Sequence, residues 1–138
     1  MGLRVGSTPE PRTYPVTRAH LVAYAGASGD RNPIHWSDRA AREIGLPGVV
    51  AHGMYTLALA GRAVADWAGG PERVLELGAR FTRPVVVPDD DLGVDVRVTG
   101  TVAATEHPAT VRVELTVTCA DRKVLGAARA LVLVEPDA

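Results

Sequence analysis

The stretch HGMYTLALAGRAVADWAGG, residues 52–70, decides the fold because it is the longest helical pattern in the chain. Its apolar residues follow the i, i+3, i+4, i+7 spacing of one helix face: Met54, Leu57, Ala58, Gly61, Val64, Ala65 and Ala68. Most of these side chains are small, so we expect a flat layer to pack closely against this face. Arg62 and Asp66 interrupt the apolar run, which excludes a membrane span.

The flat layer follows in the sequence as four strand patterns, at residues 73–87, 91–104, 109–120 and 123–135. Alternation of apolar and polar residues, clearest at Val111, Val113, Leu115 and Val117, predicts one buried and one solvated face, as in an antiparallel sheet. The expected fold is therefore α+β, a curved antiparallel sheet wrapped around a long central helix. The length of 138 residues suits a single domain, 1–138.

Three shorter patterns precede the long helix. Residues 13–17 (TYPVT) contain a proline and suit an edge strand. Thr17 is expected to cap a helix over residues 18–28 with Leu21, Val22 and Ala25 on one face. Residues 33–45 (PIHWSDRAAREIG) are expected to form a second helix with proline at its first position.

Composition excludes several functional classes. The net charge of −1 argues against a nucleic-acid-binding protein, because such proteins carry concentrated positive charge. The one cysteine, Cys119, cannot form an internal disulfide, and the cysteine spacing of a metal site is absent, so a reducing cytoplasm is the expected compartment. The first fifteen residues lack the apolar region of a secretory signal.

The stretch SGDRNPIHW, residues 28–36, holds an acid and an imidazole close to a proline. Pro33 disfavours helical backbone at Asn32, and Asn is a good N-cap, so a helix is expected to begin at Pro33. His35 then lies in the first turn, and the cap turns the chain so that Asp30 reaches the same pocket. Such a pair is suited to proton transfer. The alternative is an acid that merely complements the helix dipole beside a surface histidine.

The stretch VVAHGM, residues 49–54, leads into the long helix and places Gly53 at its first turn. Backbone N–H groups at that position have no partner within the helix, and glycine lets a ligand approach them closely. The site could therefore bind a developing oxyanion. Alternatively, Gly53 only marks a turn, and His52 only caps the helix or fills space in the core. Together with the proton-transfer pair, the pattern fits chemistry beside a carbonyl group.

Three motifs in this order, YAGASGDRNPIHW, HGM and RFTRPVVVPDD, resemble the MaoC-like hydratases and dehydratases, hot-dog-fold enzymes that act on acyl thioesters. The chain is most similar to the B subunits of the (3R)-hydroxyacyl-ACP dehydratases of type II fatty-acid (mycolic-acid) synthesis, and also to (R)-specific enoyl-CoA hydratases. The resemblance implies a hydro-lyase with Asp30 and His35 as catalytic dyad. It implies an oxyanion and substrate-binding set of Gly53, His52 and Asn32.

The resemblance also implies an acyl-CoA or acyl-ACP substrate and no metal or cofactor. It implies a dimer, either of two identical chains or with a paralogous hot-dog subunit, and neither nucleic acid nor membrane as partner. One departure is Gly61, where some hydratases of the family have a serine, and this favours the dehydratase branch. Two alternatives stay open, a hot-dog thioesterase and a non-catalytic acyl-binding subunit.

Further residues have two interpretations each. Trp36, Trp67 and Tyr55 could line an acyl tunnel, although aromatic residues on helices more often belong to the core. Arg80 and Arg83 could meet the phosphates of a pantetheine arm or an acidic carrier protein, although a solvated strand face is the commoner setting for arginine.

Overall fold

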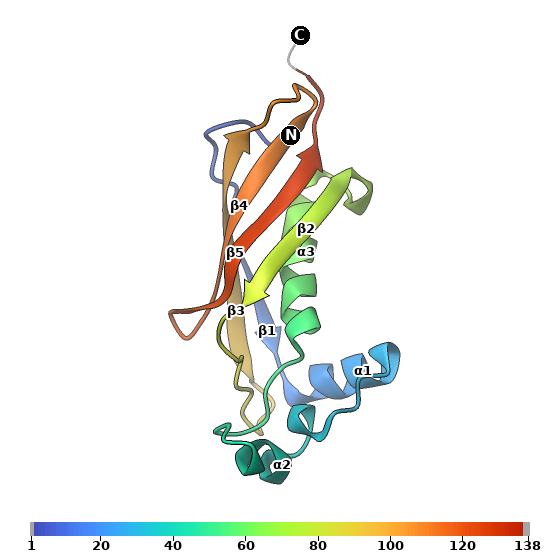
Figure 1. Cartoon of the computed structure of the whole chain (residues 1–138), viewed down its shortest axis with the longest axis vertical. Helices are drawn as coiled ribbons and strands as arrows, with labels where there is room; N and C mark the ends of the chain where they lie inside the picture. Colours follow the sequence, from blue (N-terminus) through green and yellow to red (C-terminus); the bar gives the residue numbers. More distant parts are fainter. Residues whose placement is uncertain (1, 137–138) are drawn as a thin grey trace.

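The computed structural model describes residues 2–136 and shows a sheet packed on a long helix, with shorter helices at one end (Figure 1). In chain order the elements are β1 (Arg12–Val16), α1 (Arg18–Ser28), the 3-10 turn η1 (Pro33–His35), α2 (Asp38–Glu43), α3 (Gly53–Ala68), the 3-10 turn η2 (Pro71–Arg73), β2 (Val74–Phe81), β3 (Val94–Ala104), β4 (Thr110–Cys119) and β5 (Arg122–Leu133).

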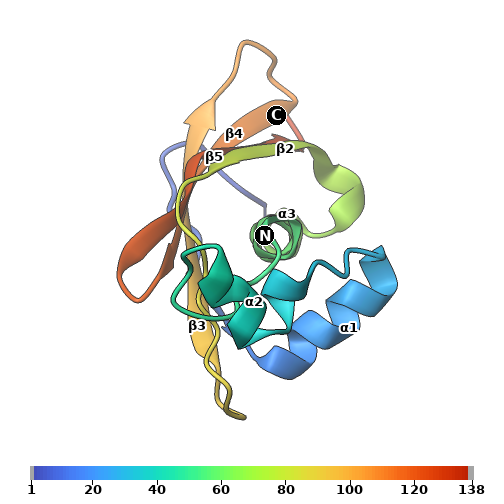
Figure 2. The ribbon, with the colours of Figure 1, turned by 60° about the horizontal axis from the view of Figure 1, so that its bottom comes forward.

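Within residues 2–136 the sheet has five antiparallel strands in the order β1-β3-β4-β5-β2. It curls around one side of α3, while α1 and α2 lie below the helix in a view close to its axis (Figure 2). The alternating valines of β3 and β4 face this core, as predicted; Val96, Val98, Val113 and Val117 are fully buried. This arrangement confirms the expected α+β hot-dog fold, with a curved sheet around a central helix.

The buried face of α3 only partly matches the predicted one. The buried residues of α3 are Thr56, Leu59, Ala60, Ala63, Val64, Trp67 and Ala68. Val64 and Ala68 were predicted correctly, but Met54 is 58% exposed and Ala58 is also exposed. Because α3 is apolar around most of its circumference, spacing alone could not identify the face against the sheet. No helix among residues 2–136 is long and apolar enough to cross a membrane.

Two expectations about the first half of the chain need correction. Thr17 caps α1 as predicted, with its side chain accepting from the His20 amide, but Val22 is 61% exposed instead of buried. The predicted helix over 33–45 is two separate pieces, η1 and α2. Ser37 interrupts it because its hydroxyl accepts from the Ala40 amide and caps a new helix.

The strand predicted over residues 73–87 ends at Phe81. Beyond a turn, Val85–Val87 run beside Val49–Ala51, with hydrogen bonds from the Ala51 amide to the Val85 carbonyl (2.9 Å) and from the Val87 amide to the Val49 carbonyl (2.9 Å). Pro84 and the turn take the chain out of the main sheet. This small antiparallel pair fixes the segment that leads into α3, and therefore the position of the α3 N-terminus.

Candidate active site

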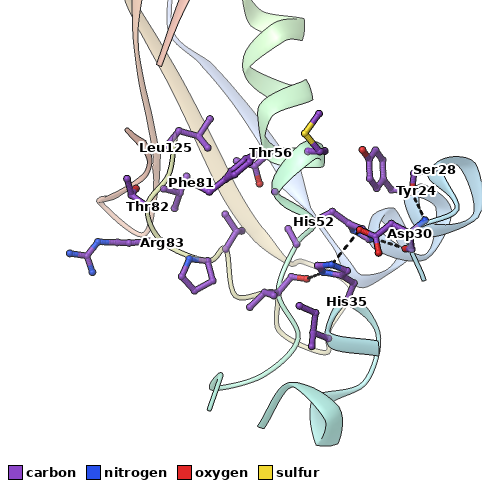
Figure 3. Close-up of a pocket in the computed structure, with 18 residues that line it drawn as sticks. Tyr24, Ser28, Asp30, His35, His52, Thr56, Phe81, Thr82, Arg83 and Leu125 are labelled. Atoms are coloured by element: carbon purple, nitrogen blue, oxygen red, sulfur yellow. Dashed lines mark hydrogen bonds and ion pairs between the residues drawn. The ribbon is translucent and has the colours of Figure 1, made fainter. Parts of the chain in front are cut away.

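A cavity of about 580 Å³ lies at the N-terminal end of α3, between η1, the end of β2 and the loop before Pro33 (Figure 3). This volume is in the usual range for a small-molecule site. Its apolar wall includes Ile34, Val50, Ala51, Val85, Val124 and Leu125. The predicted residues Asp30, His35, His52 and Gly53 all line it.

Local hydrogen bonds turn the chain between residues 30 and 36 as the sequence predicts. The Asn32 side chain accepts from the Ile34 amide (3.3 Å), and Pro33 begins η1. Asp30 Oδ1 accepts from the Asn32 amide (3.2 Å), and Trp36 Nε1 donates to the Arg31 carbonyl (3.0 Å). As a result, Asp30 Oδ2 lies 3.8 Å from His35 Nε2.

A hydrogen bond to the main chain holds the His35 ring in one orientation. Its Nδ1 lies 2.7 Å from the Val50 carbonyl oxygen, and the Val50 amide donates to the Ile34 carbonyl (3.1 Å). Because a carbonyl only accepts, Nδ1 carries a hydrogen and Nε2 is the nitrogen that faces Asp30. The Asp30 side chain is 52% exposed and His35 is buried. The separation of 3.8 Å exceeds a hydrogen bond, so both groups remain available to a third atom in the cavity.

Gly53 is the first residue of α3, and its amide donates to no acceptor among residues 2–136. The positive end of the helix dipole adds to this unsatisfied donor. A Cβ at position 53 would lie 3.0 Å from Phe81 Cε1, so glycine is the residue that allows β2 to end against this turn. The arrangement is that of a site able to stabilise negative charge on a ligand oxygen.

His52 is buried beside Gly53. Its Nε2 lies 3.0 Å from the Asp30 carbonyl oxygen, and its ring stacks on His35 with centroids 3.8 Å apart. Burial lowers the pKa of the His52 imidazole, and the nearby His35 acts in the same direction, whereas the hydrogen bond with the Asp30 carbonyl opposes them.

Asp30, His35 and His52 bring potential metal-ligand atoms within 4.8 Å of one another, but their orientation does not suit one ion. An imidazole binds a metal in the plane of its ring, at about 2 Å. The two rings are nearly parallel, with planes 21° apart, so one ion cannot lie in both planes. Two of the four ring nitrogens also face main-chain carbonyls.

Several other residues considered in the sequence lie outside the cavity. Asn32 does not line the cavity and acts as a cap, and Gly61 lies outside the lining, where a Cβ would meet Leu77. Trp36, Trp67 and Tyr55 do not line the cavity, and Arg62 and Asp66 are exposed on α3. Tyr24, Thr56 and Phe81 also line the cavity; all three lie in stretches quoted from the sequence, but none was predicted as a site residue.

Comparisons with known proteins agree with this arrangement. Residues 2–120 match the family model of the MaoC like domain. The chain is 37% identical over 73 residues to 3-hydroxyacyl-thioester dehydratase X of Mycobacterium tuberculosis, covering 53% of this chain and 25% of that protein. A solved MaoC-like dehydratase has a TM-score of 0.90 and 32% identity, covering 96% of this chain and 41% of that one.

The R-hydratase PhaJ1 from Pseudomonas aeruginosa, a solved structure, has a TM-score of 0.80 and 31% identity, covering 96% of this chain and 83% of that one. The chain therefore spans about a quarter of the length of the M. tuberculosis dehydratase. It spans less than half of the length of the solved MaoC-like dehydratase.

Proposed function

The chain belongs to the MaoC-like domain family, and from that membership we propose that it is a hydro-lyase for acyl thioesters. It adds water to a trans-2-enoyl thioester and, in the reverse direction, removes water from a (3R)-3-hydroxyacyl thioester. The observation that carries the proposal is the convergence of Asp30, His35 and the Gly53 amide on one cavity. The names of the relatives, a 3-hydroxyacyl-thioester dehydratase and an R-hydratase, support the same reaction.

The difficult step is the handling of the proton at C2, which places negative charge on the thioester oxygen. The Gly53 amide would donate to that oxygen, and a donor of this kind is worth about a hundred-fold or more in rate. In the hydration direction, water loses a proton to the dyad as its oxygen bonds to C3, and a proton is delivered to C2. Dehydration reverses each transfer.

Asp30 and His35 would hold the water oxygen together and exchange its proton. General acid–base assistance of this kind contributes roughly 10²- to 10⁴-fold. The two groups lie 3.8 Å apart and face the same cavity, so we assign the proton-transfer role to the pair and not to either residue. Asp30 Oδ1 is occupied by the Asn32 amide, which leaves Oδ2 for the reaction.

We propose that the thioester carrier leaves the cavity past Thr82 and Arg83. These residues line the side opposite Asp30, and the Arg83 side chain points outward there (Figure 3). The Thr82 hydroxyl donates to the Lys123 carbonyl (3.3 Å). A second basic residue, Lys123 of the neighbouring strand β5, therefore lies next to this exit in the backbone. Acyl-CoA and the phosphopantetheine arm of a carrier protein both carry phosphate that an arginine binds well.

We further propose that the active unit is a dimer joined along β2. β2 is an edge strand of eight residues without proline, whereas the other edge, β1, is shorter and contains Pro15. Exposed apolar side chains lie on β2, at Leu75 and Phe81, and on α3 at Met54. The partner is a second copy or a paralogous unit, and the solved MaoC-like dehydratase, of which this chain covers 41%, is long enough to hold two such units.

A second copy is favoured by charge. Glu76 and Arg80 lie symmetrically about Gly78, and neither forms an ion pair within residues 2–136. If two β2 strands pair antiparallel with Gly78 opposite Gly78, each Glu76 lies opposite Arg80 of the other copy. Such cross-strand pairs contribute roughly 0.2–1 kcal/mol each.

The reaction is tested by following the loss of ultraviolet absorbance when purified protein adds water to crotonyl-CoA and to a longer enoyl thioester. Asp30→Asn and His35→Gln should each lower kcat/KM by at least about a hundred-fold. Asp91→Asn and His107→Gln, the same changes at exposed positions outside the cavity, should leave it unchanged. Full activity in both dyad variants, or release of free thiol without hydration, would reject the proposal.

A further inference from the structure

Two buried imidazoles lie against each other behind the proposed dyad. His52 is 1% exposed, and its ring stacks on His35 with centroids 3.8 Å apart and planes 21° apart. On another side, Tyr24 meets His52 edge to face at 4.8 Å. The reaction described above uses His35 but gives His52 no step, so a buried titratable group at the centre of the site has no role yet.

The hydrogen bonds of His52 define which of its nitrogens carries a hydrogen. Nε2 lies 3.0 Å from the Asp30 carbonyl oxygen, which only accepts, so Nε2 carries the hydrogen and donates. Nδ1 is buried and has no hydrogen-bond partner among residues 2–136. A second proton at Nδ1 would create a buried charged N–H group without an acceptor, which is costly.

The surroundings of His52 oppose a charge on its ring. The groups that face it are the imidazole of His35, the carbonyl and carboxyl of Asp30 and the aromatic ring of Tyr24. The hydrogen bond to the Asp30 carbonyl and the Asp30 carboxylate favour a cationic His52, but the carboxylate is half exposed to water, which screens it. Burial and the nearby His35 both lower the pKa of His52, so the neutral form is the resting form.

His52 also links two parts of the site that are far apart in sequence. It precedes Gly53, the first residue of α3, and its side chain reaches the Asp30 carbonyl 22 residues earlier. This single hydrogen bond therefore connects the loop that bears the Asp30 carboxylate to the turn that bears the Gly53 amide. The His52 ring also covers one face of the His35 ring, so no other group among the described residues packs on that face.

We propose that His52 is a positioning residue: a permanently neutral imidazole, protonated at Nε2, that ties the Asp30 backbone to the start of α3 and supports the ring of His35. This role replaces the oxyanion-binding role expected from the sequence. It deepens the proposed function and rests on it for its kinetic consequences, because the only purpose of this tie is to keep Asp30, His35 and Gly53 facing one reactant. The proton that moves in the reaction then belongs to Asp30 and His35 alone.

Two substitutions separate the parts of this role. His52→Gln keeps an N–H donor near the position of Nε2 but removes the ring, and His52→Phe keeps a ring against His35 but removes the donor. We expect His52→Phe to lower kcat about 10- to 100-fold, with KM changed less than about threefold, since misplacement of a catalytic group by about 1 Å costs up to a hundred-fold. His52→Gln should recover at least about five-fold of that loss in kcat.

Equal losses in both variants, a loss confined to KM, or full activity of His52→Phe would overturn the tie to Asp30. Circular dichroism and the thermal midpoint of each variant show whether it is folded before its rates are compared. If either variant does not fold, the measurement on the unmodified protein described next decides the proposal alone.

The protonation state of His52 is measured without any substrate. In protein labelled with ¹⁵N at histidine, two-bond proton–nitrogen NMR spectra distinguish Nδ1 from Nε2 and protonated from bare nitrogens. We expect one buried ring, absent from spectra of His52→Gln, to show a protonated Nε2 and a bare Nδ1 from about pH 8 to about pH 5.5. Titration of that ring within this range, or the opposite tautomer, would overturn the proposal. Because this result needs no activity, it stays separate from failure of the hydration assay.

Discussion

The ring of Phe81, at the end of β2, packs against Gly53, at the start of α3, so closely that a Cβ at position 53 would lie 3.0 Å from Phe81 Cε1. This contact joins an edge of the sheet to the helix N-terminus that bears the free amide. It also places an aromatic ring beside the proposed thioester oxygen site. The glycine is therefore required by packing as well as by access to the backbone.

Gly53→Ala should consequently lower activity while the fold persists. The added methyl must displace Phe81 and narrows the approach to the amide, so we expect kcat/KM to fall about ten- to a hundred-fold. Gly26→Ala is the matched control, because a Cβ at position 26 of α1 meets nothing within 4 Å and alanine favours a helix. Hydration rates on an enoyl thioester check both. Equal rates for the two variants would show that the Gly53 amide does not serve the reaction.

The local geometry of the dyad could be predicted from sequence because every interaction that shapes it is short in range. The Asn32 side chain accepts a hydrogen bond from the Ile34 amide, Pro33 fixes the first turn, and the Asp30 carboxylate accepts from the Asn32 amide. Each of these preferences belongs to a residue type and operates within about four positions. The approach of Asp30 to His35 follows from them.

Interactions between distant segments could not be predicted in the same way. Thr56 and Phe81 line the cavity because α3 and the end of β2 meet there, and no local pattern states which face of each does so. The apolar residues of α3 occupy almost its whole circumference, so the predicted face at Met54 and Ala58 was wrong. That second apolar face borders the β2 edge, where the proposed partner would cover it. Apolar spacing in the sequence does not distinguish residues buried in the core of the chain from residues buried by a partner.

The proposed exit for the carrier predicts a specific effect of Arg83→Ala. Loss of a charge-assisted contact to phosphate at a solvent-exposed position should raise KM for crotonyl-CoA about three- to tenfold. KM for the N-acetylcysteamine thioester, which has the same acyl group and no phosphate, should stay within about twofold. Arg97→Ala removes an exposed arginine from β3, away from the cavity, and should change neither value. An identical effect on both thioesters would place the carrier elsewhere.

The pairing of two β2 strands predicts the result of exchanging their charges. Glu76→Arg or Arg80→Glu alone puts like charges opposite each other twice in the dimer, and we expect the dissociation constant to rise about tenfold. The double variant Glu76→Arg with Arg80→Glu restores opposite charges and should recover most of the affinity. Analytical ultracentrifugation over a range of concentrations measures this. Single reversals that leave association unchanged would exclude this register and favour a paralogous partner.

The neutral state of His52 predicts how stability depends on pH. An unfolded histidine titrates near pH 6.5, whereas burial lowers the pKa of His52 in the folded protein. Below pH 6.5 the unfolded chain thus binds a proton that the folded chain does not, and the free energy of unfolding falls as the pH falls. Above pH 6.5 this contribution is fully present. The slope from one such group is at most about 1.4 kcal/mol per pH unit.

The comparison with His52→Phe isolates this contribution, because the variant lacks the titrating ring and keeps the other acidic and basic groups. Urea unfolding at pH 8 should find the wild type more stable, since it retains the hydrogen bond to the Asp30 carbonyl. Between pH 6.5 and pH 5 the advantage should shrink steadily, because only the wild type loses stability through residue 52. An advantage that is constant with pH would mean that His52 has the same pKa in the folded and unfolded chains, and therefore that the buried ring accepts a proton without cost.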